Sequence, residues 1–251
     1  MTDGDRQRVA LITGGAVRVG RAISLGLARA GYDLVVSYHS SGDAAESLAA
    51  EVERLGRKVV TVKVDLVEPR AADELIEVVQ SSFLHLDVLV NSAASFRSRP
   101  LLSVDPDEWD RVMNLNVRAP HLLVRAAADL LQDSRGCVVN ITDLSAWHAW
   151  HAYPHHAVSK AALSHLTRVQ ARALAPEVRV NAIAPGTVLP PDDWPEGSVS
   201  ALIAQSALKR TGDPDDVLQA LLYLIEADFV TGHVLPVDGG RLLGPPGPST
   251  T

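Results

Sequence analysis

The sequence has one cysteine, few aromatic residues and no long uncharged apolar run. Because Cys137 is alone, a disulfide within the chain and a metal site built from cysteines are both excluded. No stretch is long and apolar enough to cross a membrane, and the pattern of a secretory signal is missing. We therefore expect a soluble, cytoplasmic protein that does not bind a membrane.

The charge balance also lacks a basic excess. The 23 Lys and Arg residues are outnumbered by 30 Asp and Glu residues, which gives a formal net charge of -7. This net charge gives no indication of binding to a nucleic acid or to an anionic lipid surface, and we expect neither as a partner. With 47% hydrophobic residues, its 251 residues are enough to bury a large core.

Short apolar strands alternate with longer amphipathic helices along the chain. We expect strands at residues 9–13, 33–38, 59–64, 86–90, 137–141, 178–183 and 234–237. We expect helices at residues 19–30, 44–55, 71–83, 106–132 (interrupted near 114–116), from the 153–163 segment to 174, and 214–225. Apolar strands separated by helices predict a parallel sheet covered on both faces. The predicted fold is a single-domain, doubly wound α/β sheet of the Rossmann type over residues 1–243, followed by a disordered Pro- and Gly-rich tail at 244–251.

A glycine-rich turn connects the first expected strand to the first expected helix. Its sequence is Thr13-Gly14-Gly15-Ala16-Val17-Arg18-Val19-Gly20. Glycines allow a tight turn and let the backbone approach a pyrophosphate at the N-terminus of a helix. The turn predicts a dinucleotide site with contacts from Gly14, Arg18, Val19 and Gly20.

The end of the second strand indicates which dinucleotide binds. An acidic residue there would accept from the ribose 2′-hydroxyl and repel a 2′-phosphate. The chain instead has His39, Ser40 and Ser41, and its first acid after them is Asp43. Since these three side chains can donate to a phosphate, we predict NADP(H) as the cofactor.

A second motif lies at the start of the helix that follows residue 153. His156 precedes Lys160 by four residues, so the two side chains share one helix face. With the glycine-rich turn, this segment resembles the short-chain dehydrogenase/reductase family over about residues 7–242. The resemblance implies that Lys160 binds the nicotinamide ribose. It also implies that the ring four residues earlier, a tyrosine in the family and His156 here, donates the proton.

Other segments match the family in the expected order. Asp65 follows the third strand, Asn91-Ser92-Ala93-Ala94 resembles the family's NNAG segment, and Pro185-Gly186-Thr187-Val188 resembles its PG motif. Asn116 matches an asparagine of the family that stabilises a helix kink and binds a water of the proton relay. The further cofactor-binding residues implied by these segments are Asp65, Leu66, Asn91, Ala93, Pro185, Gly186 and Val188.

Asp143 stands where the family places its active-site serine, thirteen residues before His156. An aspartate there, together with Arg18, His39 and Phe96, resembles the pteridine reductases. That resemblance implies that Phe96 packs a pterin ring against the nicotinamide, and that Asp143 orients a water or bonds the nitrogens of the ring.

His156 leaves three alternatives open. An imidazole titrates near ~6.5 and a tyrosine near ~10 in the reference state. The Lys160 ammonium disfavours imidazolium, so we expect His156 to tend to be neutral unless Asp143 offsets that charge. His156 is then the proton donor, directly or through water; or Tyr153, Asp143 or water supplies the proton; or ordinary reduction has been lost.

Aromatic and histidine side chains gather between residues 147 and 156, in a chain with only 4% aromatic residues. This clustering predicts a wall that stacks a flat ring, and the alternative is a packed subunit interface or core edge. No metal site is expected. The predicted substrate-contacting residues are Arg18, Phe96, Asp143, Trp147, Tyr153 and Trp194.

The predicted function is NADPH-dependent reduction of a pterin-like or other cyclic C=N or C=O substrate, with Asp143, His156, Lys160 and Asn116 as catalytic residues. The alternative is a redox-impaired protein of the same fold that binds NADP(H) or another ligand in a structural or regulatory role. The family resemblance also implies a small-molecule substrate and a homotetramer built on the long helices.

Overall fold

The computed structural model describes residues 6–190 and 197–244. Trp194 and residues 245–251 of the predicted tail lie outside this range. The described chain forms one seven-stranded sheet in the order β3-β2-β1-β4-β5-β6-β7, and every neighbouring pair of strands is parallel. The strands are β1 (Arg8–Thr13), β2 (Tyr32–Tyr38), β3 (Val59–Lys63), β4 (Val88–Asn91), β5 (Cys137–Ile141), β6 (Arg179–Pro185) and β7 (Val234–Val237).

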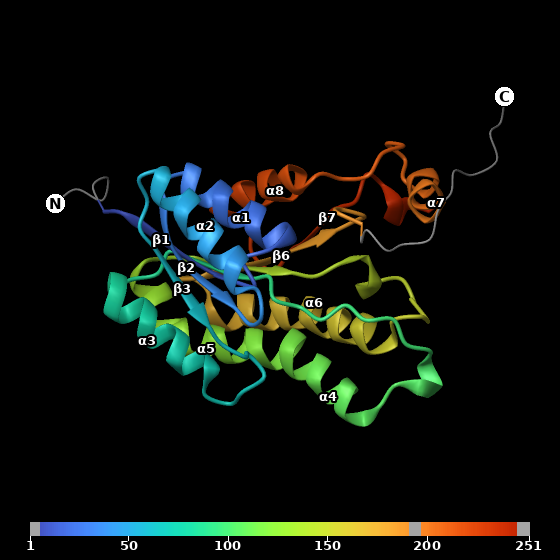
Figure 1. Cartoon of the computed structure of the whole chain (residues 1–251), viewed down its shortest axis with the longest axis horizontal. Coiled ribbons are helices and arrows are strands. Elements are labelled where there is room, and N and C mark those ends of the chain that lie inside the picture. Colours follow the sequence, from blue (N-terminus) through green and yellow to red (C-terminus); the bar gives the residue numbers. More distant parts are fainter. Residues whose placement is uncertain (1–5, 191–196, 245–251) are drawn as a thin grey trace.

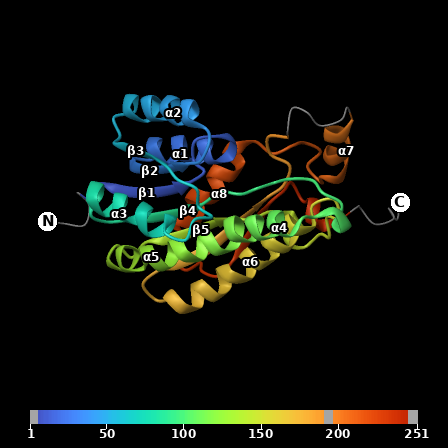
Figure 2. The ribbon, with the colours of Figure 1, turned by 60° about the horizontal axis from the view of Figure 1, so that its bottom comes forward.

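Helices cover both faces of this sheet (Figure 1). One face carries α1 (Arg18–Arg29), α2 (Gly42–Arg54) and α8 (Pro214–Glu226). The opposite face carries α3 (Ala71–Phe83), α4 (Pro106–Met113), α5 (Ala119–Asp133) and α6 (Pro154–Leu174). The short helix α7 (Ser198–Gln205) lies beyond the end of the sheet toward which β1 points (Figure 2).

The strands are apolar throughout because the helices cover both of their faces. In β1, Val9 and Leu11 pack toward α3 and α5, while Ala10 and Ile12 pack toward α1 and α8. All five residues of β5 are buried, including Cys137. Successive side chains of a strand point to opposite faces, so a strand in the middle of a three-layer fold has no polar face to show. The predicted doubly wound Rossmann-type fold is confirmed.

A π-helical turn separates α4 from α5. It spans Asn114–Arg118, at the interruption expected near residues 114–116. Asn116 inside this turn is fully buried. Single π-helical turns inside α-helices are often found at functional sites.

The loops that follow β1, β2, β4, β5 and β6 all leave from the same edge of the sheet, because parallel strands have their carboxyl ends together. The strand order reverses between β1 and β4, which creates the crevice where doubly wound sheets bind ligands. In the part of the chain that the structure describes, no helix is long and apolar enough to span a membrane.

Candidate active site

Two adjoining cavities open at the carboxyl ends of the strands. The first has a volume of about 470 Å³ and lies between the glycine-rich turn and the ends of β2, β3 and β4. The second has a volume of about 690 Å³ and lies between the ends of β5 and β6, the segment 149–153 and α7. Arg18 and Phe96 line both cavities, so the two form one continuous site.

The glycine-rich turn is packed so closely that side chains are excluded from it. Gly14 has a φ of +62°, and a Cβ there would lie 3.0 Å from the Cα of Ala93. A Cβ on Gly20 would lie 2.3 Å from the carbonyl oxygen of Gly14. The backbone of the turn therefore forms the floor of the first cavity at the N-terminus of α1, where the helix dipole and free N–H groups favour a phosphate.

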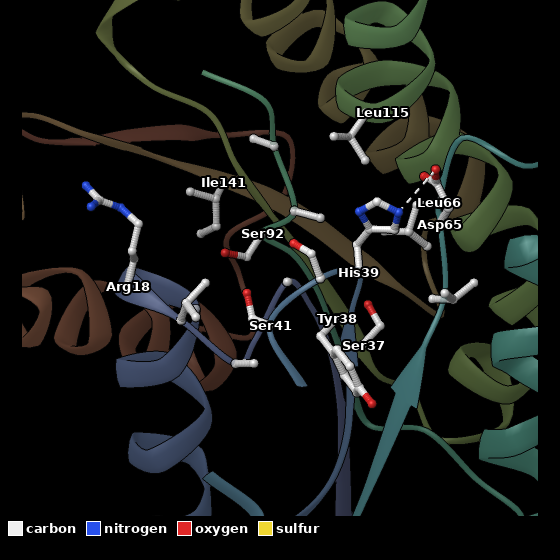
Figure 3. Close-up of a pocket in the computed structure, with 18 of the residues that line it drawn as sticks. Arg18, Ser37, Tyr38, His39, Ser41, Asp65, Leu66, Ser92, Leu115 and Ile141 are labelled. Atoms are coloured by element: carbon white, nitrogen blue, oxygen red, sulfur yellow. Dashed lines mark ion pairs between the residues drawn. The ribbon is translucent and has the colours of Figure 1, made fainter. Parts of the chain in front are cut away.

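Arg18 adopts a left-handed backbone conformation, with a φ of +51°. This conformation costs an ordinary residue roughly 1–2 kcal/mol and costs glycine nothing, which explains why a glycine is usual there. The guanidinium donates to the carbonyl oxygen of Leu189, on the loop after β6. Arg18 thus joins the glycine-rich turn to the loop that borders the second cavity. Figure 3 shows Arg18 at one end of the first cavity.

The opposite end of the first cavity holds a small charged cluster (Figure 3). The Nε2 of His39 lies 3.5 Å from a carboxylate oxygen of Asp65, and Arg111 donates to the same oxygen at 3.1 Å. Burial raises the pKa of Asp65, but a backbone hydrogen bond from Val67 and the Arg111 guanidinium outweigh it and lower the pKa. Arg111 was not predicted from the sequence, because it lies on α4, far along the chain from the cofactor motifs.

Two buried asparagines brace this edge of the sheet. Asn91 donates to the side-chain oxygen of Asn140 at 2.8 Å. Asn116 accepts from the backbone N–H of Ser95 at 3.1 Å and donates to the hydroxyl of Ser159 at 2.9 Å. Neither asparagine lines a cavity, so both hold the loops and helices that do.

Asp143 and His156 form a close pair beside the second cavity. The Nε2 of His156 lies 2.5 Å from one carboxylate oxygen of Asp143, and its Nδ1 lies 2.9 Å from the carbonyl oxygen of Ser95. The other carboxylate oxygen accepts from the backbone N–H of Ser145 at 2.8 Å and from its hydroxyl. The His156 side chain is 3% exposed and the Asp143 side chain 17%, and only Asp143 lines the cavity.

The contacts of this pair place an acceptor beside each ring nitrogen of His156. Burial raises the pKa of Asp143, but the His156 hydrogen bond, the charges of His156 and Lys160, and the Ser145 hydroxyl together lower it. Asp143 is therefore a carboxylate beside Nε2, and the Ser95 carbonyl oxygen beside Nδ1 also only accepts. The expectation that His156 tends to be neutral unless Asp143 offsets the Lys160 charge stays a prediction.

Lys160 lies buried beneath the same pair. Its Nζ donates to the carbonyl oxygen of Ile141 at 2.7 Å, at the end of β5. Burial lowers the pKa of Lys160, and the negative charge of Asp143 opposes that shift only in part. Lys160 lines neither cavity, but Ile141, which it contacts, lines the first.

Trp150, His151 and Tyr153 of the aromatic and histidine cluster line the second cavity, together with Phe96. Phe96 and Tyr153 are stacked, with ring centroids 4.4 Å apart and planes 11° apart. Trp150 lies edge-on to both rings, and the ring of His156 lies edge-on to Phe96. Trp147 is 45% exposed and is not among the residues that line either cavity.

The structure thus brings most of the predicted residues to one site. Within the described residues, no three His, Cys, Asp or Glu side chains gather as metal ligands would. The first cavity is lined by the predicted residues Gly14, Arg18, Val19, Gly20, His39, Ser40, Ser41, Asp65, Leu66, Ala93 and Phe96. The second cavity is lined by the predicted residues Arg18, Phe96, Asp143, Tyr153, Pro185, Gly186 and Val188.

Comparison with known proteins identifies relatives across almost the whole chain. A family described as enoyl-(acyl carrier protein) reductase matches residues 15–241. An uncharacterised oxidoreductase of Mycobacterium tuberculosis is 34% identical over 241 residues, which are 93% of this chain and 91% of the relative. A 3-oxoacyl-[acyl-carrier-protein] reductase of Synechocystis is 31% identical over 242 residues, covering 94% and 97%. The crystal structure of a blue fluorescent protein from a metagenomic library, in complex with NADPH, has a TM-score of 0.88 and 33% identity, covering 94% and 98%.

Proposed function

Since the chain belongs to the short-chain dehydrogenase/reductase family, we propose that it is an NADP(H)-dependent reductase of a cyclic C=N or C=O group. A pterin-like ring is the substrate that we favour. The observation that carries the proposal is the close pair of Asp143 and His156, of which Asp143 lines the cavity that adjoins the cleft at the glycine-rich turn. The stacked Phe96 and Tyr153 rings add a flat surface on which such a ring packs.

The residues of the first cavity fit an NADP(H) molecule. The turn at Gly14 and Gly20 leaves no room for a Cβ, so its backbone is open to a pyrophosphate. We assign the 2′-phosphate to His39, Ser40 and Ser41, and the adenine to Asp65 and Leu66. The nicotinamide end is assigned to Pro185, Gly186 and Val188 in the second cavity, and the ribose to Lys160. When bound, NADPH supplies the hydride that adds to the carbon of the substrate.

Asp143 and His156 supply the proton that the neighbouring nitrogen or oxygen of the substrate needs. We take the substrate to bind against Asp143, because His156 is shielded from the cavity. The proton between Nε2 and the carboxylate passes to the substrate, and His156 keeps the Nδ1 proton that it donates to Ser95. The pair then carries one net negative charge, which the buried Lys160 ammonium stabilises. A proton from solvent then reprotonates the pair, so each turnover consumes one hydride and one proton.

NADPH oxidation by the purified protein tests this proposal. We expect turnover with dihydrobiopterin or dihydrofolate, and we would run cyclic ketones and a 3-oxoacyl thioester beside them. Because the cleft is preformed, NADPH fluorescence should report binding before any substrate is added. Binding without turnover on every substrate would contradict the proposal and favour the ligand-binding alternative, for which the shielding of His156 is the supporting observation.

His39→Asp should invert the cofactor preference. The new carboxylate would stand at the end of β2, repel a 2′-phosphate and accept from a 2′-hydroxyl. We expect the ratio of kcat/KM for NADPH to that for NADH to fall by at least about tenfold, which corresponds to ~1.4 kcal/mol. His39→Asn is the matched control, since it removes the imidazole without adding a charge. An unchanged ratio in the Asp variant would show that the 2′-phosphate does not bind there.

The homotetramer implied by the family resemblance stays a prediction. Val158 and Val169 are half-exposed apolar side chains on α6. We infer that α5 and α6 form the contact between subunits, where these side chains would be covered.

A further inference from the structure

Arg241 lines the second cavity, as Asp143 does. It follows β7 and begins a single helical turn, Arg241–Leu243. The carboxylate of Asp238 accepts from the backbone N–H groups of Gly240 at 2.8 Å and Leu242 at 2.7 Å. The backbone on both sides of Arg241 is therefore held in place, and its side chain projects from a fixed point.

Neutral groups hold the guanidinium of Arg241. Its Nη1 donates to the hydroxyl of Thr187 at 3.3 Å, its Nε donates to the side-chain oxygen of Gln205 at 3.3 Å, and its Cζ lies 5.8 Å from the centre of the Trp150 ring. Among the described residues, no carboxylate lies within ion-pair distance of it. Burial lowers the pKa of Arg241 and the charge of Asp238 opposes this shift, but a guanidinium stays protonated in a protein. Arg241 is thus an oriented and partly desolvated cation.

Among the described residues that line the second cavity, two arginines accompany one carboxylate. That carboxylate is Asp143, which is already paired with His156. Arg18 also lines the cavity, and its guanidinium donates to a neutral carbonyl oxygen, that of Leu189. A partly buried cation without an anionic partner favours a ligand that brings the missing negative charge.

We infer that Arg241 and Thr187 form a carboxylate-binding subsite, and that the substrate is a flat ring bearing a carboxylate group. This inference rests on the proposed function and names its substrate class more closely. The Thr187 hydroxyl accepts from Arg241 and keeps its own proton to donate, so guanidinium and hydroxyl offer one donor to each oxygen of a carboxylate. The ring would then pack on the Phe96–Tyr153 stack, toward Asp143.

Arg241 lies away from the part of the site that we assign to the adenine and the phosphates of the cofactor. It does not line the first cavity, which contains the glycine-rich turn and the His39–Asp65 cluster. Its partners Thr187 and Gln205 belong to the loop after β6 and to α7, which border the second cavity and a small hollow beside it. A dianionic phosphate would call for more cationic donors than one guanidinium and one hydroxyl provide, which is why we choose a carboxylate.

Binding of a non-reducible ligand pair tests the subsite without relying on turnover. We would titrate 4-propylbenzoate and 4-propylbenzamide into the protein saturated with NADPH, by calorimetry. We expect the acid to bind at least about tenfold more tightly than the amide, and Arg241→Gln to remove that difference. Arg29→Gln, the same change at an exposed position of α1, should leave it unchanged.

Three results would overturn the inference. The acid and amide could bind the wild-type protein equally, Arg241→Gln could leave the acid's advantage intact, or Arg241→Gln could weaken NADPH rather than the acid. The comparison of acid and amide binding to the wild-type protein tests the subsite even if Arg241→Gln does not fold. A parallel assay of 4-acetylbenzoate and its methyl ester keeps the two proposals separate. If neither ketone is reduced while the acid–amide difference stands, the proposed reaction fails for this class but the subsite holds.

Discussion

Asp143→Asn is expected to lower kcat by about 10²- to 10⁴-fold, the range in which a positioned acid or base contributes to a reaction. The amide carries no charge, so nothing favours a second proton on the His156 ring. With Nδ1 donating to Ser95, the neutral ring turns an Nε2 lone pair toward residue 143, where the amide N–H donates to it. The pair then holds no proton for the substrate, although its shape is almost unchanged.

Binding measurements separate this loss from a general disturbance of the site. Asp143 does not line the first cavity, so the Kd for NADPH should change by less than about twofold, within the ordinary scatter of neutral substitutions. Asp73→Asn is the matched control: the same change on the exposed partner of Arg125, which should leave kcat unaltered. A kcat within twofold of the wild type in Asp143→Asn would exclude the pair as proton donor and favour Tyr153 or a water.

Most of the fold could be predicted from the sequence because its signals are local. Each strand is a short apolar run between turn residues, and a strand buried on both faces needs no more than that. The helix from residue 71 to 83 and the strands at 137–141 and 234–237 agree with the structure at both ends. The break near residue 114 was expected from its two asparagines, but its π-helical form was not, since that form depends on the contacts of Asn116 with Ser95 and Ser159.

The contacts of His156 could be predicted only in part. The thirteen-residue spacing from Asp143 indicates one partner, but the partner of Nδ1 is a backbone carbonyl sixty-one residues away in the chain. A backbone carbonyl is present at every residue, so the sequence does not indicate which one a side chain will contact.

The two additional arginines were missed for a related reason. Arg111 reaches the first cavity from α4, and Arg241 reaches the second from the turn after β7. Neither belongs to a motif that the sequence shows. Arg241 directly follows Val237-Asp238-Gly239-Gly240, whose two adjacent glycines are a turn signal. The tight turn of those glycines is what directs the side chain into the cavity.

His156→Tyr, which restores the ring that the family resemblance implies, should lower kcat/KM by at least about tenfold instead of raising it. The His156 ring is almost fully buried, 4.9 Å from the Phe96 ring and 2.5 Å from Asp143, so the longer tyrosine has no free space. It also leaves the Ser95 carbonyl oxygen without its donor. A phenol beside a carboxylate holds its proton more tightly, which makes it a poorer acid.

The double variant Asp143→Ser/His156→Tyr should recover activity that both single variants lose. The serine removes the negative charge and shortens the side chain, so the tyrosine hydroxyl gains both space and a neutral partner. Residues in contact commonly show coupling free energies of roughly 0.5–3 kcal/mol, and we expect the upper half of that range here. The measurement is kcat/KM for the wild type and the three variants, with thermal unfolding to confirm that each is folded. If the kcat/KM of His156→Tyr alone exceeds that of the wild type, the histidine is a poorer proton donor than the tyrosine it replaces, and Asp143 does not assist it. If only the double variant recovers, the aspartate and the histidine work as one unit, and neither can be replaced without the other.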